Sequence, residues 1–435
     1  MSTSRVTRLL SVSALACASL LGTPSAQAIS PPPVDDTWLP KPARPVPPWP
    51  TVQRETCAAI TTGSAPGPLM AGLDLSRVWR LTRGAGQRVA VIDTGVSRHR
   101  LLPDVVAGGD YVSTGDGTQD CDAHGTLVAG IIAATADSAA GDFGGVAPEA
   151  TVISVRQSSA KFSPAGDRSR AGVGDVDTMA KAVRTAADLG ASVINISSVA
   201  CVAAASALDD RALGAALAYA VDVKNAVVVA AAGNTGGSAP CPPQRSDATW
   251  DTVTVAVSPA WYDDYVLTVG SVNPGGGPST FTLAGPWVDV AAPGEAVTPL
   301  GSEPVSGTSF AAPIVSGLAA LIRARFPALT ARQVMQRIES TAHHPSAGWD
   351  PLVGHGTIDA LAAVSTDAGA PGTTPAPAPA PAPIAAPPPA APPNDRARDT
   401  ALRGAAVCLA GLGMALAAGV AGARLRAARN RVASD

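Results

Sequence analysis

The stretch Val305-Ser-Gly-Thr-Ser-Phe-Ala-Ala-Pro313 carries a serine, Ser309, just after a glycine-bearing turn and before the apolar run 314–322. A serine hydroxyl is a poor nucleophile unless a neighbouring base takes its proton and a third group holds that base. At the start of a helix, a serine is more often simply an N-cap. The function of this stretch therefore depends on whether the rest of the chain supplies a base, a holder and a site for negative charge.

Around this stretch, short apolar runs alternate with helical patterns. We expect strands at 88–92, 151–155, 192–196, 226–231, 253–257, 266–269 and 288–291, and helices at 126–134, 175–189, 211–221, 309–326 and 330–340. Continuously apolar strands that alternate with helices predict an α/β fold, in which helices cover both faces of a parallel sheet. Functional side chains in such sheets gather at the carboxyl ends of the strands.

Two further motifs supply the missing groups. Val89-Ala-Val-Ile-Asp93-Thr-Gly95 places a carboxylate at the end of a buried strand, and Asp122-Ala-His124-Gly-Thr-Leu-Val-Ala-Gly130 places a histidine at the start of a helix among small residues. Each motif has an ordinary alternative, a strand-ending turn or a structural histidine. Their order, Asp then His then Ser on a parallel α/β pattern, favours a catalytic triad.

These motifs resemble those of the subtilisin-type serine proteases, and the similarity covers about residues 75–364. A fourth match is Val227-Val-Val-Ala-Ala-Ala-Gly-Asn234, for which a turn before Gly236 and Gly237 is the structural alternative. The resemblance implies that the Asn234 side chain and the backbone N–H of Ser309 bind the oxyanion.

The same resemblance implies the remaining roles. Ser309 attacks the peptide carbonyl, His124 moves the proton, and Asp93 fixes the tautomer of His124. The resemblance also implies that an edge of three residues pairs with an extended substrate: Ser197, Ser198 and Val199.

The chain also carries segments outside the catalytic body. Residues 1–28 predict a secretory signal peptide, because Arg5 and Arg8 precede an apolar run and Ala26-Gln-Ala28 forms a small-x-small cleavage site. A buried N-terminal helix is the alternative. The remaining expected segments are a Pro-rich extended segment, a catalytic domain and a semi-rigid Pro/Ala-rich linker, at 29–66, 67–367 and 368–399.

Residues 404–423 predict one transmembrane helix. This stretch of twenty residues has no charge, and about twenty apolar residues span a bilayer core. Arginines within 424–435 should hold that tail in the cytoplasm. A buried core helix is the alternative. The expected protein is a single-pass protein of the cell membrane with an extracytoplasmic catalytic domain.

Charge and cysteine content narrow the class further. The net charge is −3 and no dense basic block occurs before the extreme C-terminus, which argues against nucleic-acid binding. Outside 1–28 and 404–423 remain four cysteines, Cys57, Cys121, Cys201 and Cys241, which predict two disulfides with three connectivities open. No close C-x-x-C pair or compact acidic run is present, so we assign no metal, calcium included, and no cofactor.

The overall plan is similar to that of the mycosins, membrane-anchored proteases of actinobacterial type VII secretion systems. The phrases Asp120-Cys-Asp-Ala-His124, Ser154-Val-Arg-Gln-Ser-Ser159 and Asn195-Ile-Ser-Ser-Val-Ala-Cys201 agree with that family, whereas Ala123 replaces its usual Gly and Ser198 a common Glu. In the family the N-terminal segment wraps the body and a disulfide ties it down. The resemblance therefore implies the pairs Cys57–Cys121 and Cys201–Cys241.

The resemblance supports two functions. The first is a serine endopeptidase that cleaves exported proteins in association with a type VII secretion membrane complex. The second is a structural component that stabilises that complex, with proteolysis dispensable. A general surface protease is a third alternative, which the membrane anchor disfavours.

Overall fold

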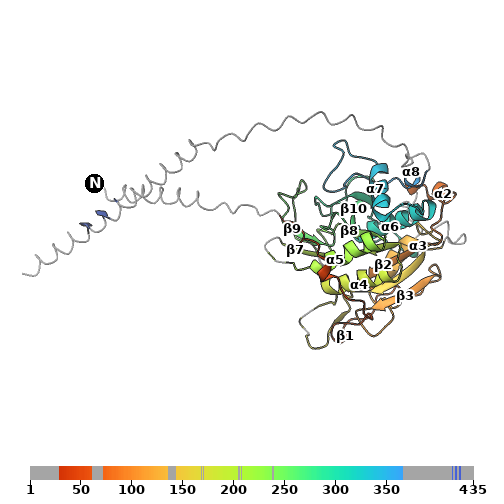
Figure 1. Cartoon of the computed structure of the whole chain (residues 1–435), viewed down its shortest axis with the longest axis horizontal. Helices are drawn as coiled ribbons and strands as arrows, with labels where there is room; N and C mark the ends of the chain where they lie inside the picture. The colour runs from red at the N-terminus through yellow and green to blue at the C-terminus, as the bar shows by residue number, and fades with distance from the viewer. Residues whose placement is uncertain are drawn as a thin grey trace, which may run out of the picture. The chain divides into compact units, whose positions relative to one another are not determined.

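The computed structural model describes residues 29–60, 72–135 and 144–365, apart from 168, 170, 204, 205, 207, 238 and 239, together with five positions between 414 and 422. The chain divides into two units, Met1–Gly369 and Ala370–Asp435. All elements named below belong to the first unit and are labelled in part in Figure 1. The predicted signal peptide lies outside the described residues, as does the predicted boundary at residue 67.

The centre of the fold is a seven-stranded sheet whose neighbours all run parallel, in the order β11-β10-β8-β6-β2-β4-β3. All of its strands except β3 are buried along nearly their whole length, which explains their largely apolar sequences. The predicted parallel α/β sheet is therefore confirmed. The strands are β2 Arg88–Asp93, β3 Val105–Asp110, β4 Thr151–Arg156, β6 Val193–Ile196, β8 Val227–Ala231, β10 Leu267–Val272 and β11 Val290–Pro293.

Helices cover both faces of this sheet (Figure 1). α3 (His124–Ala133) and α6 (Thr308–Arg325) pack against each other on one face, and α4 (Val176–Asp188) and α5 (Arg211–Ala218) pack against each other on the other. α6 is buried from Thr308 to Ile322 and contacts β6, β8, β10 and β11, so its start is held firmly against the sheet. The remaining helical elements are η1 Asp36–Trp38, α2 Leu75–Val78, η3 Tyr219–Val223, η4 Pro299–Gly301, α7 Ala331–Thr341 and α8 Ala360–Val364.

Two helix starts follow directly from sequence. Asp175 caps α4 and Thr330 caps α7, each in a reciprocal capping box with the third helical residue, Thr178 or Gln333. Both starts agree with the predicted helices. The predicted helix 211–221 ends earlier as an α-helix, because its last turn widens into the π-helical η3.

The predicted strand 253–257 does not join the parallel sheet. It forms β9 (Val255–Ser258), which pairs antiparallel with β7 (Ala200–Ala203) in a separate two-stranded sheet. An apolar run shows that a strand is buried, but the run does not specify which partner covers it. β3 was not predicted from the sequence, because Gly108 and Gly109 interrupt its apolar pattern at a β-bulge.

The N-terminal extension is more ordered than its prolines indicate. Beyond Pro50, β1 (Thr51–Gln53) is free of proline and pairs antiparallel with β5 (Phe162–Pro164). The extension is then joined to the body by the disulfide Cys57–Cys121, and the second disulfide is Cys201–Cys241. These are the two pairs that the family resemblance implied.

The predicted span 404–423 falls almost entirely outside the described residues. Within the part of the chain that the structure describes, no helix combines the length and the apolarity needed to cross a membrane.

Candidate active site

Three side chains from three elements form one hydrogen-bonded row. Asp93 ends β2, His124 begins α3, and Ser309 lies in the first turn of α6. The Asp93 Oδ1 to His124 Nδ1 distance is 2.7 Å, and the His124 Nε2 to Ser309 Oγ distance is 3.0 Å. A carboxylate, an imidazole and a hydroxyl in this sequence can make the hydroxyl nucleophilic, since the imidazole can take its proton.

Two glycines permit this approach. A Cβ on Gly125 would lie 2.2 Å from the carbonyl oxygen of Gly95 and 3.1 Å from the Cβ of Asp93, so α3 can approach the end of β2 only with glycine at that position. A Cβ on Gly307 would lie 3.1 Å from Ser309 Oγ. The small residues that the sequence placed beside His124 and Ser309 therefore have a steric role.

The histidine is held between a buried carboxylate and a ring. The side chain of Asp93 is 2% exposed, whereas that of His124 is 30% exposed and so reaches solvent. The ring centroids of His124 and Phe310 are 5.1 Å apart. Burial lowers the pKa of His124, but the charge and hydrogen bond of Asp93, with the charges of Asp120 and Asp122, outweigh burial and raise that pKa.

Backbone groups fix Asp93 independently of the histidine. The backbone N–H of Thr94 donates to Asp93 Oδ1 at 2.7 Å. The carbonyl oxygen of Asp93 accepts from the backbone N–H groups of Gln157 and Ser158, at 2.8 and 3.3 Å. Asp93 is thus anchored through its carboxylate to its own turn and through its backbone carbonyl to the segment that follows β4.

The amide of Asn234 is oriented by its neighbour on α6. Its Oδ1 accepts from the backbone N–H of Thr308 at 3.0 Å and from Thr308 Oγ1 at 3.1 Å. The amide nitrogen therefore turns toward Gly307, where an added Cβ would lie 3.6 Å from Asn234 Nδ2 and 3.1 Å from Ser309 Oγ. This places a hydrogen-bond donor beside the nucleophile, where an oxyanion would form.

Sequence reasoning missed Thr308. Its position directly before Ser309, in the first turn of a buried helix, was the available signal. A hydroxyl there can reach back across the helix start, and here it bonds with Asn234 and accepts from the backbone N–H of Gly233.

The three residues of the predicted substrate edge divide into two kinds. The side chain of Ser197 is buried and donates to the carbonyl oxygen of Ser309 at 2.9 Å, so a substrate contact would fall to its backbone. Ser198 and Val199 line a cavity of about 160 Å³. The other lining residues are Gln157, Ser158, Gly174, Asp175, Val176, Met179, Ala200, Leu213, Ser258 and Pro259.

The second disulfide supports the segment that carries Asn234. The backbone N–H of Cys241 donates to the carbonyl oxygen of Asn234 at 2.8 Å. A Cβ on Gly233 would lie 3.0 Å from Cys241 Sγ.

Among the described residues, no group of three or more His, Cys, Asp or Glu side chains is placed to hold a metal ion.

Comparison with known proteins adds four similarities. Residues 84–356, which include Asp93, His124, Asn234 and Ser309, match the model of the subtilase family, Peptidase S8. Mycosin-4 of Mycobacterium tuberculosis H37Rv is 68% identical over 457 aligned residues, covering 100% of both chains. The serine protease MycP1, an essential component of the type VII (ESX-1) secretion system, has a TM-score of 0.72 at 44% identity, covering 78% of this chain and 100% of its own. A chain of the intact ESX-5 inner membrane complex has a TM-score of 0.71 at 40% identity, covering 90% of this chain and 100% of its own.

Proposed function

The chain belongs to the subtilase family of serine proteases and, within it, to the mycosins, and from this membership we propose that Asp93, His124 and Ser309 are its catalytic triad. The observation that carries the proposal is the continuous row of hydrogen bonds at 2.7 and 3.0 Å from Asp93 through His124 to Ser309. The reaction is hydrolysis of peptide bonds in protein substrates, as in other subtilisin-type endopeptidases.

Each group has one task in this reaction. His124 Nε2 takes the proton from Ser309 Oγ as the oxygen attacks the carbonyl carbon, and later donates it to the leaving amine. Asp93 accepts the hydrogen bond from His124 Nδ1–H and stabilises the imidazolium that forms. Asn234 Nδ2 and the backbone N–H of Ser309 donate to the oxyanion of the tetrahedral intermediate.

A fluorophosphonate probe tests the triad directly, since it forms a covalent bond with an activated serine. The full-length wild-type chain should be labelled at Ser309, as located by peptide mapping. Ser309→Ala and His124→Ala should not be labelled, although both should unfold at the temperature of the wild type. Equal labelling of wild type and Ser309→Ala would refute the assignment.

The setting of this activity is proposed as a membrane that houses a type VII secretion system. Support comes from MycP1, an essential component of the ESX-1 system, and from the ESX-5 inner membrane complex, one chain of which matches 90% of this chain. We place the catalytic domain outside the cytoplasm, with residues 404–423 as a single-pass anchor and 424–435 as a cytoplasmic tail. Exported proteins are the substrates that such a location makes available.

A second function, structural support of the secretion complex, is favoured by the same ESX-5 similarity. The two functions are separated by comparing a Ser309→Ala strain with a deletion strain. If deletion stops secretion while Ser309→Ala only leaves an exported protein unprocessed, the protein supports the complex independently of proteolysis. If both strains fail to secrete, proteolysis itself is required.

A further inference from the structure

The helix that begins with His124 has no N-cap side chain of its own. Ala123 occupies the cap position with φ 66° and ψ −11°, and an alanine methyl cannot accept a hydrogen bond from the first turn. The N–H groups of this first turn have no partner within the helix, and they must find one elsewhere because Gly125 and Thr126 are buried. The group that satisfies one of them comes from farther back in the chain.

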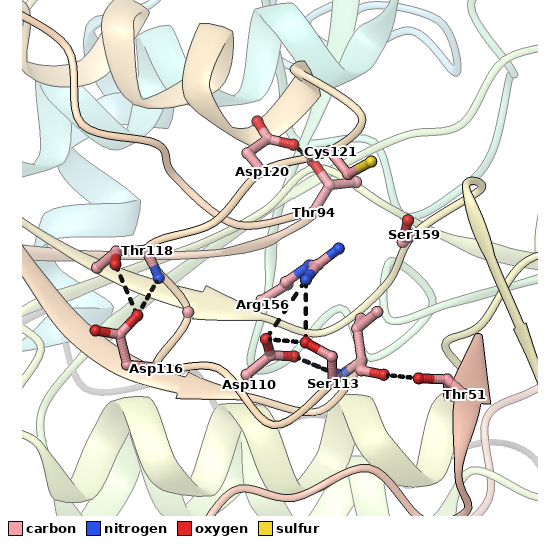
Figure 2. A network of polar contacts seen from close by, with 12 residues as sticks. Thr51, Thr94, Asp110, Ser113, Asp116, Thr118, Asp120, Cys121, Arg156 and Ser159 are labelled. Carbon is pink, nitrogen blue, oxygen red and sulfur yellow. Dashed lines mark hydrogen bonds and ion pairs between the residues drawn. The ribbon is translucent and has the colours of Figure 1, made fainter. Parts of the chain in front are cut away.

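That group is the carboxylate of Asp120. Its Oδ2 accepts from the backbone N–H of Thr126 at 2.9 Å and from Thr126 Oγ1 at 2.7 Å. Its Oδ1 accepts from Thr94 Oγ1 at 2.8 Å, the contact drawn near the top of Figure 2, and from the backbone N–H of Asp122 at 3.0 Å. One carboxylate thereby joins the turn after β2 to the start of α3.

Two further hydrogen bonds connect the turn after β2 with the start of α3. Thr94 Oγ1, which donates to Asp120, accepts from the backbone N–H of Gly125 at 2.9 Å. Thr126 Oγ1 accepts from the backbone N–H of Ser97 at 3.0 Å. Thr94 directly follows Asp93, and Gly125 directly follows His124, so this network sets the relative position of the two catalytic side chains without touching the substrate.

The charges around the imidazole are all negative carboxylates, Asp93 from β2 and Asp120 and Asp122 from the loop before α3, while α6 contributes the uncharged Ser309 and Phe310. Burial raises the pKa of Asp120 above its ordinary value, against the lowering effect of the hydrogen bonds from Thr126 and Thr94. A buried carboxylate whose pKa is perturbed in this way is often a functional residue.

We infer that Asp120 is a positioning residue for the proposed triad: it fixes the start of α3 against the end of β2, and its charge also favours the imidazolium of His124. The inference rests on the proposed catalytic function. It predicts two separable effects of losing the carboxylate, one on geometry and one on the pH dependence of the reaction.

The test measures the rate constant for fluorophosphonate labelling of Ser309 across pH in the full-length chain. In Asp120→Asn, one amide hydrogen must point at a donor, so α3 shifts against β2 and the pH-independent plateau falls by roughly 10- to 100-fold. The acidic limb moves to lower pH, since loss of a nearby negative charge lowers the pKa of His124 and the base stays neutral at lower pH.

Asp122→Asn is the matched control, since it removes the same charge from the same loop. The side chain of Asp122 accepts its hydrogen bonds elsewhere, from Ser159 Oγ and from the backbone N–H of Ala160, and the backbone N–H of Asp122 that bonds to Asp120 is kept in the variant. This variant should therefore shift the acidic limb in the same direction but keep the wild-type plateau. Equal plateaus for the two variants, or an unmoved limb in Asp120→Asn, would overturn the inference.

A second pair of variants covers the case in which Asp120→Asn does not fold. Thr126→Val keeps the shape but loses the hydroxyl, whereas Thr126→Ser keeps the hydroxyl; the plateau should fall in the first and recover in the second. If wild type is not labelled at Ser309, the proposed function itself has failed. If wild type is labelled and all these variants match it, only the role of Asp120 is refuted.

Discussion

At Asn234 one amide makes two kinds of contact. Its oxygen accepts from Thr308, at 3.0 Å from the backbone nitrogen and 3.1 Å from the hydroxyl, and its nitrogen is thereby turned toward Ser309. Asn234→Asp keeps the acceptor but loses the donor and adds a negative charge where the oxyanion forms. We expect turnover to fall by about 10²–10³-fold in Asn234→Ala and at least as far in Asn234→Asp, measured by hydrolysis of a fluorogenic peptide.

Thr308→Val tests how much the orientation of the Asn234 amide contributes, since the Nδ2 donor of Asn234 is itself kept in this variant. The backbone N–H of Thr308 remains, so the amide of Asn234 keeps one of its two holders. The loss of turnover should be smaller than in Asn234→Ala, and thermal unfolding should change little more than for Thr308→Ser. A Thr308→Val variant as slow as Asn234→Ala would mean that the hydroxyl acts on the reaction in another way.

Ala123 occupies a left-handed backbone position, φ 66°, that costs a non-glycine residue about 1 kcal/mol. Ala123→Gly should remove this strain and raise the free energy of unfolding by up to about 1 kcal/mol, which is about 2 °C in the melting temperature. Differential scanning calorimetry measures the shift. A lower melting temperature would show that the methyl group contributes packing that outweighs the strain.

The side chains of the proposed triad could be predicted because each lies inside a contiguous motif. Each motif has a glycine within two residues of its functional side chain, where a larger residue would clash with neighbouring atoms. The structure brings the side chains of Asp93, His124 and Ser309 together. Asp120 and Thr308 could not be assigned in this way, because a carboxylate or hydroxyl gains its role from partners that only the folded backbone selects. Ser197 shows the converse, since its side chain turned inward although its segment was recognised.

At the level of elements, the N-terminal extension is bound to the body through several different contacts. β1 pairs with β5, Lys161 forms an ion pair with Glu55 at 2.6 Å, and the backbone N–H of Ala58 donates to the carbonyl oxygen of Cys121 at 2.8 Å. The last of these contacts ends on Cys121, next to Asp120, so the extension also supports the loop that leads into α3. The sequence predicted the segment but not its pairing, because β5 has only three residues and so shows no strand pattern.

A buried ion pair lies beneath this docking site. Arg156, 1% exposed at the end of β4, lies 3.5 Å from Asp110 of β3 and 3.4 Å from Ser113, as Figure 2 shows. Its guanidinium also stacks over the ring of Phe162 in β5 at 4.6 Å. Because Phe162 belongs to the strand that pairs with β1, docking of the extension helps to keep this cation out of water.

The disulfide of the extension should contribute strongly to stability. Cys57 and Cys121 are separated by 64 residues, and closing a loop of that length in the unfolded chain corresponds to about 4 kcal/mol. We expect Cys57→Ser/Cys121→Ser to lose up to this much unfolding free energy in guanidinium titrations and to become sensitive to protease between Pro50 and Cys57.

Removal of the other disulfide provides the comparison. Cys201→Ser/Cys241→Ser frees the segment behind Asn234, so it should lower the labelling rate of Ser309 while leaving the extension resistant to protease. If instead both double variants released the extension equally, the Cys57–Cys121 disulfide would not be the bond that specifically holds the extension to the body.

For the whole molecule, the two units make the catalytic body separable from the proposed anchor. The last helix of the body, α8, packs on α2, α6 and α7, and Arg337 bonds with the carbonyl oxygens of Ala363 and Ser365. The body is thus closed by contacts that precede residue 367, and residues 368–399 are Pro/Ala-rich.

Truncation after Asp367 should therefore leave an intact catalytic domain that is no longer attached to the membrane. Because the triad and both disulfides precede this point, the truncated chain should be labelled by a fluorophosphonate at the wild-type rate. It should also leave the membrane fraction, as carbonate extraction and immunoblotting would show, while deletion of 424–435 alone should not release the protein. If the truncated chain stays with the membrane, the body itself binds there, and the proposed anchor at 404–423 is not the main attachment.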